Sequence, residues 1–309
     1  MNTAIYLIRA VSLITVGVII ANIVLESDAM QKLSPLIRPF CSASNLPKEG
    51  AVSLFASFFN PTAGKSTLAG FYHEGKIGDK ETILTVLMST FPIVVGESLF
   101  RVHVPIALVL LGPFIGSIYI VLSLLSAFIQ SFGAFVYAKL RLPQSTCVEE
   151  EIYKYAEKTP KNQKLKTALK KSFSTLKRVL PIMVVAFVVV DFLFTLSLMN
   201  SISVIFDPVL RVLDLPGEVI TALVADLAHF SAGYAIVAAL LTKGVITAKQ
   251  AILTLLIGSM LIITLVYLKY SLSMYISLFG KLGVKITVIT YLNSMVAKLL
   301  MILLVVAVM

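Results

Sequence analysis

Long apolar runs separated by short polar stretches cover most of the chain. In the first half they span residues 5–25 and 115–139, and in the second half residues 180–198, 248–267 and 286–308. A helix rises about 1.5 Å per residue, so about 20 apolar residues cross a bilayer core of about 30 Å. These runs therefore predict membrane-crossing helices and an all-α polytopic membrane protein.

Two other apolar segments, residues 50–72 and 216–241, are interrupted near the middle. The first contains Asn-Pro-Thr-Ala-Gly-Lys at positions 60–65, and the second has His229 in the register of Asn60. Proline removes a backbone donor and glycine weakens a helix, so each segment predicts two short helical arms around an irregular turn. Irregular backbone persists at membrane depth only inside the protein or beside a wet cavity.

Shorter interruptions are predicted elsewhere. A helix over residues 81–101 contains Pro92 and Gly96, and the following apolar piece ends at Gly112, just before a proline. In the second half, a helix is predicted to end at Tyr267 and to be followed by a separate short piece over residues 272–279.

Residues of many chemical types recur at a constant spacing of 169 positions. Apolar residues match by chance in such a protein, whereas charged residues, prolines and glycines do not. The matched pairs include Arg9 with Arg178, Pro39 with Pro208, Glu49 with Glu218, Gly64 with Gly233 and Lys80 with Lys249. We infer an internal duplication, with a first repeat at residues 1–140, a charged cytoplasmic linker at 141–177 and a second repeat at 178–309.

Composition strengthens the membrane assignment. Hydrophobic residues form 58% of the chain and charged residues 14%, with a mean hydropathy of +0.95, against about 45–50% and about 25% in soluble domains. The net charge of +10 gathers between the apolar runs, where the positive-inside rule places cytoplasmic loops. We expect a multi-pass protein of the cell membrane that contacts lipid and a small-molecule solute. A homo-oligomer is left open, and no nucleic acid is expected.

The orientation of the two halves depends on whether the broken segments cross the membrane or enter and return. If they return as re-entrant hairpins, each half has three full spans and the halves are oppositely oriented. Most basic residues, including those of the linker, then lie inside. Because the crossing arrangement spreads them more evenly, the positive-inside rule favours inverted repeats.

The local sequence is more specific than this layout. Phe59-Asn60-Pro61-x-x-Gly64 and the segments 80–88 and 91–101 resemble a Gate, or nucleoside-recognition, domain, and residues 229–280 resemble a second, more diverged copy. That family includes the paired Gate modules of ferrous-iron transporter B proteins, spore maturation proteins and parts of concentrative nucleoside transporters. The resemblance implies a permease fold. Iron-transporting members have a cysteine where this chain has Asn60, so iron transport is not expected.

Candidate anion-binding residues gather at the first break and in the helix after it. An ionisable side chain at the centre of a membrane helix costs at least about 2.5–3.5 kcal/mol, so it usually faces a cavity or a partner. Lys65, beside the free N–H groups of the second arm, is suited to an anionic group; alternatively it snorkels or pairs with Glu97. The predicted substrate-binding residues are Asn60, Thr62, Lys65, Ser66, Glu97, Arg101, His229, Ser231 and Tyr234.

The second break carries the candidates for ion coupling. Asp226 and His229 lie three residues apart, on one helical face, and are suited to carrying a proton; a structural hydrogen bond explains them equally well. Asp191, late in the first helix of its half, is a third candidate. No cofactor is expected beyond a coupling proton or Na⁺, and the two cysteines, Cys41 and Cys147, have no metal-site spacing.

These features predict a secondary transporter for a small polar or anionic solute, nucleoside-like solutes included, that uses alternating access around a midplane site formed by the two broken helices. The alternative is a non-transport membrane scaffold or complex subunit of the spore-maturation type. An enzyme is not expected. Gly64-Lys65-Ser66 looks like the end of a phosphate-binding loop, but that motif requires a glycine where Phe59 stands.

Overall fold

The structure, a computed structural model, describes residues 42–95, 104–143, 212–228 and 230–309, with single positions near residues 15–19 and 165–181. Every regular element in these ranges is helical. Three of the described helices are long and apolar enough to cross a membrane: Ala107–Arg141, Ala248–Phe279 and Lys281–Val308. They agree with the all-α membrane protein predicted above. The predicted helices over residues 5–25 and 180–198, and most of the linker, lie outside the described residues.

The first broken segment is a pair of helices, α3 (Lys48–Phe59) and α4 (Pro61–His73). Asn60 between them has extended backbone, with φ −153° and ψ 115°, and its side chain accepts a hydrogen bond from the Ala63 N–H at 3.0 Å. A capping asparagine followed by proline at the first helical position is a strong start signal for a helix. The break predicted at Asn60 is therefore confirmed.

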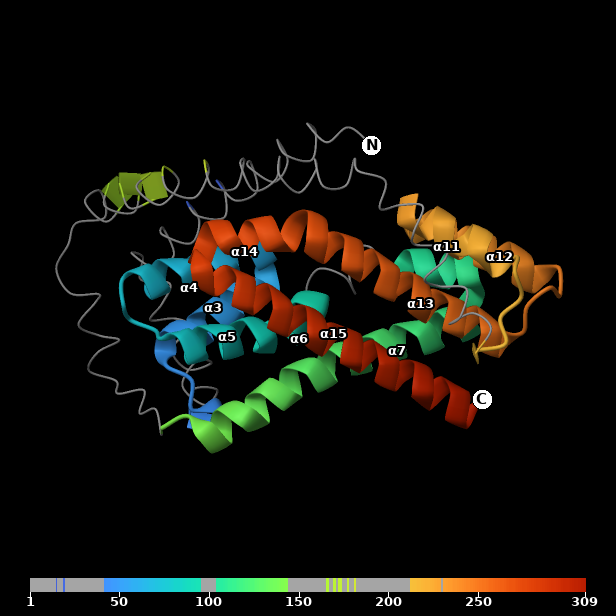
Figure 1. Ribbon diagram of the computed structural model, residues 1–309, viewed down its shortest axis with the longest axis horizontal. Coiled ribbons are helices and arrows are strands. Elements are labelled where there is room, and N and C mark those ends of the chain that lie inside the picture. The colour runs from blue at the N-terminus through green and yellow to red at the C-terminus, as the bar shows by residue number, and fades with distance from the viewer. Residues whose placement is uncertain are drawn as a thin grey trace.

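The two arms fold back on each other as a helical hairpin. A Cβ placed on Gly64 of α4 would lie 2.6 Å from the backbone nitrogen of Ser57 in α3, so only glycine fits at this crossing. In Figure 1, α3 and α4 lie together at one end of the molecule. We call this pair the first hairpin.

The second broken segment forms a similar hairpin from α11 (Val219–Ala228) and α12 (Phe230–Thr242). Here a Cβ on Gly233 would lie 2.6 Å from the Cβ of Asp226. Gly64 and Gly233, like Ser57 and Asp226, are 169 positions apart. This second hairpin lies at the opposite end of the long axis in Figure 1.

Each hairpin is followed by the same tight turn. Gly75 and Gly244 both have φ +70°, a left-handed conformation that favours glycine. Their N–H groups donate to Tyr72 O at 3.1 Å and Leu241 O at 3.0 Å. Before the hairpins, Asn45 and Asp214 have φ of 56° and 51°. Local backbone geometry therefore recurs at the spacing of the sequence repeat.

The long helices connect and cover the hairpins. In the first half, α5 (Asp79–Met88) and the short α6 (Thr90–Ile93) precede α7 (Val104–Arg141), which is kinked at Gly112 as predicted. In the second half, α13 (Ala248–Val266) continues through a π-helical turn, η2 (Tyr267–Ser271), into α14 (Leu272–Phe279), and α15 (Lys281–Val308) follows.

The predicted separation between a helix ending at Tyr267 and a short piece from Leu272 is wrong. A widened turn joins them, and this region has neither proline nor glycine to stop the helix. The reversal comes later, at Gly280, whose φ is +59°. Helix α15 then runs back across α7 (Figure 1).

Candidate functional site

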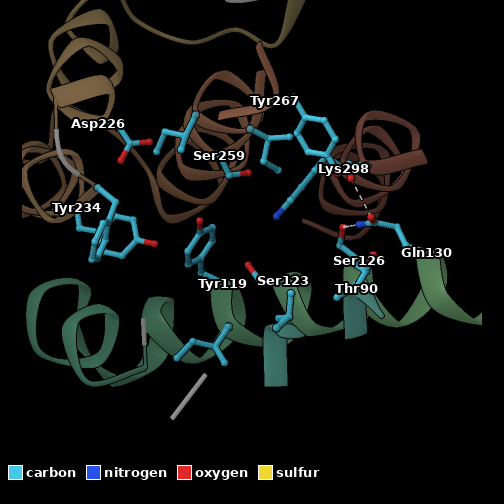
Figure 2. A pocket seen from close by; sticks show the side chains of 17 residues that line it. Thr90, Tyr119, Ser123, Ser126, Gln130, Asp226, Tyr234, Ser259, Tyr267 and Lys298 are labelled. Atoms are coloured by element: carbon cyan, nitrogen blue, oxygen red, sulfur yellow. Dashed lines mark hydrogen bonds between the residues drawn. The ribbon is translucent and has the colours of Figure 1, made fainter. Parts of the chain in front are cut away.

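A cavity of about 460 Å³ lies between α7, the second hairpin, α13, η2 and α15. Cavities of about 300–1,000 Å³ are typical of small-molecule sites. Apolar residues, including Ile120, Ile262 and Ile263, form part of the wall. Polar residues contribute the remainder: Thr90, Tyr119, Ser123, Ser126, Gln130, Asp226, Tyr234, Ser259, Tyr267, Ser294 and Lys298. Figure 2 shows most of these side chains around the open space.

Asp226 supplies a carboxylate to this cavity from the end of α11. The residue is 6% exposed, and its Oδ1 has no hydrogen-bond partner in the described part of the chain. Its carboxylate lies in a slot formed by two glycines, because a Cβ on Gly233 or on Gly258 of α13 would collide with its oxygens. The absence of side chains at both positions makes room for the acid.

Lys298 supplies the opposite charge from α15. It is 7% exposed and lines the cavity. Figure 2 shows the ammonium pointing into the cavity, with Asp226 on the opposite side of the view and Tyr119 between them. Lys298 was not predicted, although it is an ionisable residue inside an apolar run, the same signal that indicated Asp226.

Aromatic rings join the second hairpin to α7. The rings of Tyr119 and Tyr234 meet edge to face with centroids 5.6 Å apart, and Phe230 meets Tyr234 in the same way at 5.6 Å. This geometry suits the charge distribution of aromatic rings. The three rings hold the start of α12 against the cavity wall.

Gln130 joins α7 to α15 on the side of the cavity away from the second hairpin. Its Oε1 accepts a hydrogen bond from Ser294 Oγ at 2.9 Å, and its Nε2 donates to Ser126 Oγ at 3.4 Å. Figure 2 shows both contacts. Gln130 therefore has a hydrogen-bond partner on each of the two helices, whereas Oδ1 of Asp226 has none among the described residues.

The structure brings together only part of the predicted site. Asp226 and Tyr234 line the cavity, whereas Asn60, Thr62, Lys65 and Ser66 belong to the first hairpin and do not. The Lys65 ammonium lies 5.1 Å from the centre of the Tyr275 ring. Ser66 is buried, and its hydroxyl has no hydrogen-bond partner among the described residues.

Other predicted residues lie outside the structural description. Glu97, Arg101, Asp191 and His229 are not among the described residues, and the side chain of Ser231 is not described. The possible ion pair of Lys65 with Glu97, and the contact between Asp226 and His229, therefore stay predictions.

Comparisons with known proteins identify a family. The family model described as Gate, nucleoside recognition, matches residues 7–114 and 176–282, more than half of the chain. The matched segments begin at residues 7 and 176, which reproduces the spacing of the repeat.

Three uncharacterized proteins of Methanocaldococcus jannaschii are similar to this chain. One is 43% identical over 98% of both chains. The others are 27% identical over 93% of this chain and 89% of the relative, and 26% identical over 89% and 86%. No solved structure matches.

Proposed function

This chain belongs to the Gate (nucleoside recognition) family, and we propose that it is a secondary transporter of the cell membrane for a small polar or anionic solute, nucleoside-like solutes included. The observation that carries the proposal is the cavity beside the second hairpin, which combines the size of a small-molecule site with two buried charges. An ionisable side chain buried in a membrane segment costs free energy, and such residues usually belong to a functional site.

The hairpins support a re-entrant arrangement. Their arms contain 12 and 13 residues in the first hairpin and 10 and 13 in the second, which correspond to about 15–20 Å at about 1.5 Å per residue. An arm of that length does not cross a core of about 30 Å. Each hairpin then enters and leaves the membrane on one side, which is a recurring arrangement at transporter sites.

Inverted repeats would then place the two hairpins on opposite sides. The recurrence of backbone geometry at 169 positions supports repeats at residues 1–140 and 178–309, joined by the cytoplasmic linker at 141–177. Rocking of the second hairpin against α7 would expose the cavity alternately to each side. Asp226 is also the candidate to carry a coupling proton or Na⁺.

Thermal stabilisation by solutes tests the function. Nucleosides, nucleobases, carboxylates, amino acids and divalent metals are added to the purified protein in lipid nanodiscs, and the melting temperature is measured. A ligand that binds only the native state stabilises it by about 2.7 kcal/mol at 100 times its Kd. We expect one solute class to raise the melting temperature. No stabilisation by any class would favour the scaffold alternative.

Cysteine labelling tests the inverted topology. Single cysteines replace Lys76 and Val245, which follow the equivalent turns 169 positions apart, in a variant without Cys41 and Cys147. Both positions are exposed. We expect membrane-impermeant reagents to label them from opposite sides of the membrane. Labelling from the same side would contradict the inversion but leave the duplication intact.

A further inference from the structure

The described lining of the cavity contains one acidic and one basic side chain. Among its described lining residues, Asp226 and Lys298 are the only ones with formal charge, and both are more than nine-tenths buried. The remaining polar groups are hydroxyls and the Gln130 amide, and several isoleucines lie between them. The site therefore offers one positive and one negative group to whatever enters.

These two groups do not neutralise each other directly. No ion pair joins Asp226 to Lys298 in the described part of the chain, and Oδ1 of Asp226 has no hydrogen-bond partner there. Figure 2 places them on opposite sides of the cavity, with Tyr119 between them. A buried charge is strongly unfavourable until an opposite charge or several hydrogen bonds meet it.

Each class of solute satisfies these groups differently. A solute with only an anionic group would pair with Lys298, leave Asp226 unpaired and add a second negative charge to the cavity. A solute with only a cationic group would do the reverse, and an uncharged solute would leave both charges without a counter-ion. When no proton or Na⁺ occupies Asp226, a solute with both charges pairs each group and keeps the cavity neutral.

We propose that the cavity binds a zwitterionic organic solute, with its anionic group on Lys298, its ammonium group on Asp226 and its apolar or aromatic body between them. This inference rests on the proposed function and specifies the substrate class of the same site. The volume of about 460 Å³ accommodates a solute of this kind, and Tyr119 and Ile263 line the wall that its body would contact.

The experiment measures binding to the full-length protein in nanodiscs by calorimetry. The probes are ω-amino acids of increasing length, from glycine to 6-aminohexanoate, each beside analogues that lack one charge. For 6-aminohexanoate these are 6-aminohexanamide, which lacks the carboxylate, and 6-hydroxyhexanoate, which lacks the ammonium. We expect the zwitterion of best length to bind at least about tenfold more tightly than either analogue, because each analogue loses a charge-assisted contact.

Two variants test which residue binds each charged group of the solute. Lys298→Met should weaken binding of the zwitterion about 10- to 100-fold. The variant should then bind the zwitterion no more tightly than the amide analogue. Asp226→Asn should bind the zwitterion no more tightly than the hydroxy acid analogue. Lys269→Met is the matched control, since Lys269 does not line the cavity, and it should leave binding unchanged. Melting temperatures show that each variant is folded, and methionine replaces the buried lysine at similar volume.

The outcomes separate this inference from the proposed function. If single-charge analogues bind as tightly as the zwitterions, the zwitterion inference is wrong. It is also wrong if Lys298→Met still binds the zwitterion more tightly than the amide analogue by the wild-type factor. If Asp226→Asn leaves zwitterion binding intact, Asp226 does not hold the ammonium and the inference is also wrong. Stabilisation by another solute class alone would overturn the inference and leave the transporter proposal standing. If no solute of any class binds, both fail.

Discussion

The two hairpins have matching backbones but differ at one buried position. Ser57 in the first hairpin and Asp226 in the second hold the same register, each packed against a glycine of the following arm. Ser57 Oγ donates to the Ser53 carbonyl at 2.8 Å, so its polar group is satisfied within its own helix. Oδ1 of Asp226 has no hydrogen-bond partner in the described ranges. At this register the first hairpin thus satisfies its polar group within its own helix, whereas the second presents a carboxyl group to the cavity.

A second position changes together with the first. Gly258, which leaves space for the Asp226 carboxylate, occupies the register of Ser89 in the first half. Ser89 is buried, and its hydroxyl donates to the Val86 carbonyl at 2.7 Å. A small hydroxyl at both positions in one half corresponds to an acid and a glycine in the other. The pair of differences leaves an acid beside the cavity in the second half alone, as the proposed site requires.

Each hairpin also contacts a residue of the other half. Lys65 and Tyr234 share a register, and each meets an aromatic ring of the other half. The Lys65 ammonium lies 5.1 Å from the Tyr275 ring centre, and the Tyr234 ring lies 5.6 Å from that of Tyr119. Each hairpin therefore contacts the other half in addition to the helices of its own half.

The largest expected effect is on stability, at the glycine that the hairpins share. In Gly64→Ala, the new Cβ would lie 2.6 Å from Ser57 N and 2.7 Å from its Cα, and backbone atoms cannot rotate away. Overpacking of this kind costs about 1–3 kcal/mol. Thermal unfolding in nanodiscs should show a clear loss of stability, and Gly233→Ala should behave similarly, because the Cβ of Asp226 is equally close.

Gly70→Ala is the matched control for this prediction. Gly70 lies in the same helix with nothing within 4 Å of its built Cβ, so alanine should be neutral or stabilise by up to about 1 kcal/mol. Equal melting temperatures for the Gly64 and Gly70 variants would show that the arms are not packed as described.

The next effect is on binding. In Gly258→Ala, the new Cβ meets only the carboxylate end of Asp226, which can rotate away. Affinity for the bound solute should fall by about tenfold, which corresponds to about 1.4 kcal/mol, with a smaller change in melting temperature. Gly133→Ala, on α7 in open space, is the control. Unchanged affinity in Gly258→Ala would indicate that the carboxylate position is not used.

Asn60→Ala separates a cap from a binding residue. The side chain of Asn60 caps α4 through Ala63, so its removal should cost about 0.5–2 kcal/mol of stability. Solute affinity should stay unchanged, and Asn60→Asp should retain most of the stability. If affinity falls while melting temperature does not, Asn60 contacts the solute, as the sequence suggested.

Lys65→Met should have the smallest effect. Loss of the contact with the Tyr275 ring is expected to cost about 0.5–1 kcal/mol, and Tyr275→Phe should retain it because the aromatic face remains. Affinity for the solute should not change, since Lys65 does not line the cavity. A loss of affinity by one or two orders of magnitude for an anionic solute would instead support the anion site predicted at the first break.

Sequence reasoning located the breaks well because their causes are local. Proline after Asn60, the glycine turns and the kink at Gly112 each follow from the conformational limits of one or two residues. The continuous passage from α13 to α14 was missed, because a π-helical turn at Tyr267 leaves no composition signal. Tyr267 itself lines the cavity, whereas Tyr275 of α14 meets Lys65.

The site was only partly predictable for a different reason. Asp226 was recognised from the cost of a buried charge, and the same rule applied to Lys298 would have found it within its apolar run. The contact between Gln130 and Ser294 joins residues 164 positions apart. No local pattern indicates such a pair, because it depends on how α7 and α15 cross.

Uptake into proteoliposomes tests the central claim, that the cavity beside the second hairpin is a transport site. The solute that stabilises the wild-type protein is supplied in labelled form, and its entry is followed for wild type, Lys298→Met and Lys269→Met. We predict saturable uptake by wild type and Lys269→Met, and loss of most uptake in folded Lys298→Met. A wild-type protein that binds the solute but does not carry it across the membrane, or a Lys298→Met variant that transports it as fast as wild type, would contradict the account.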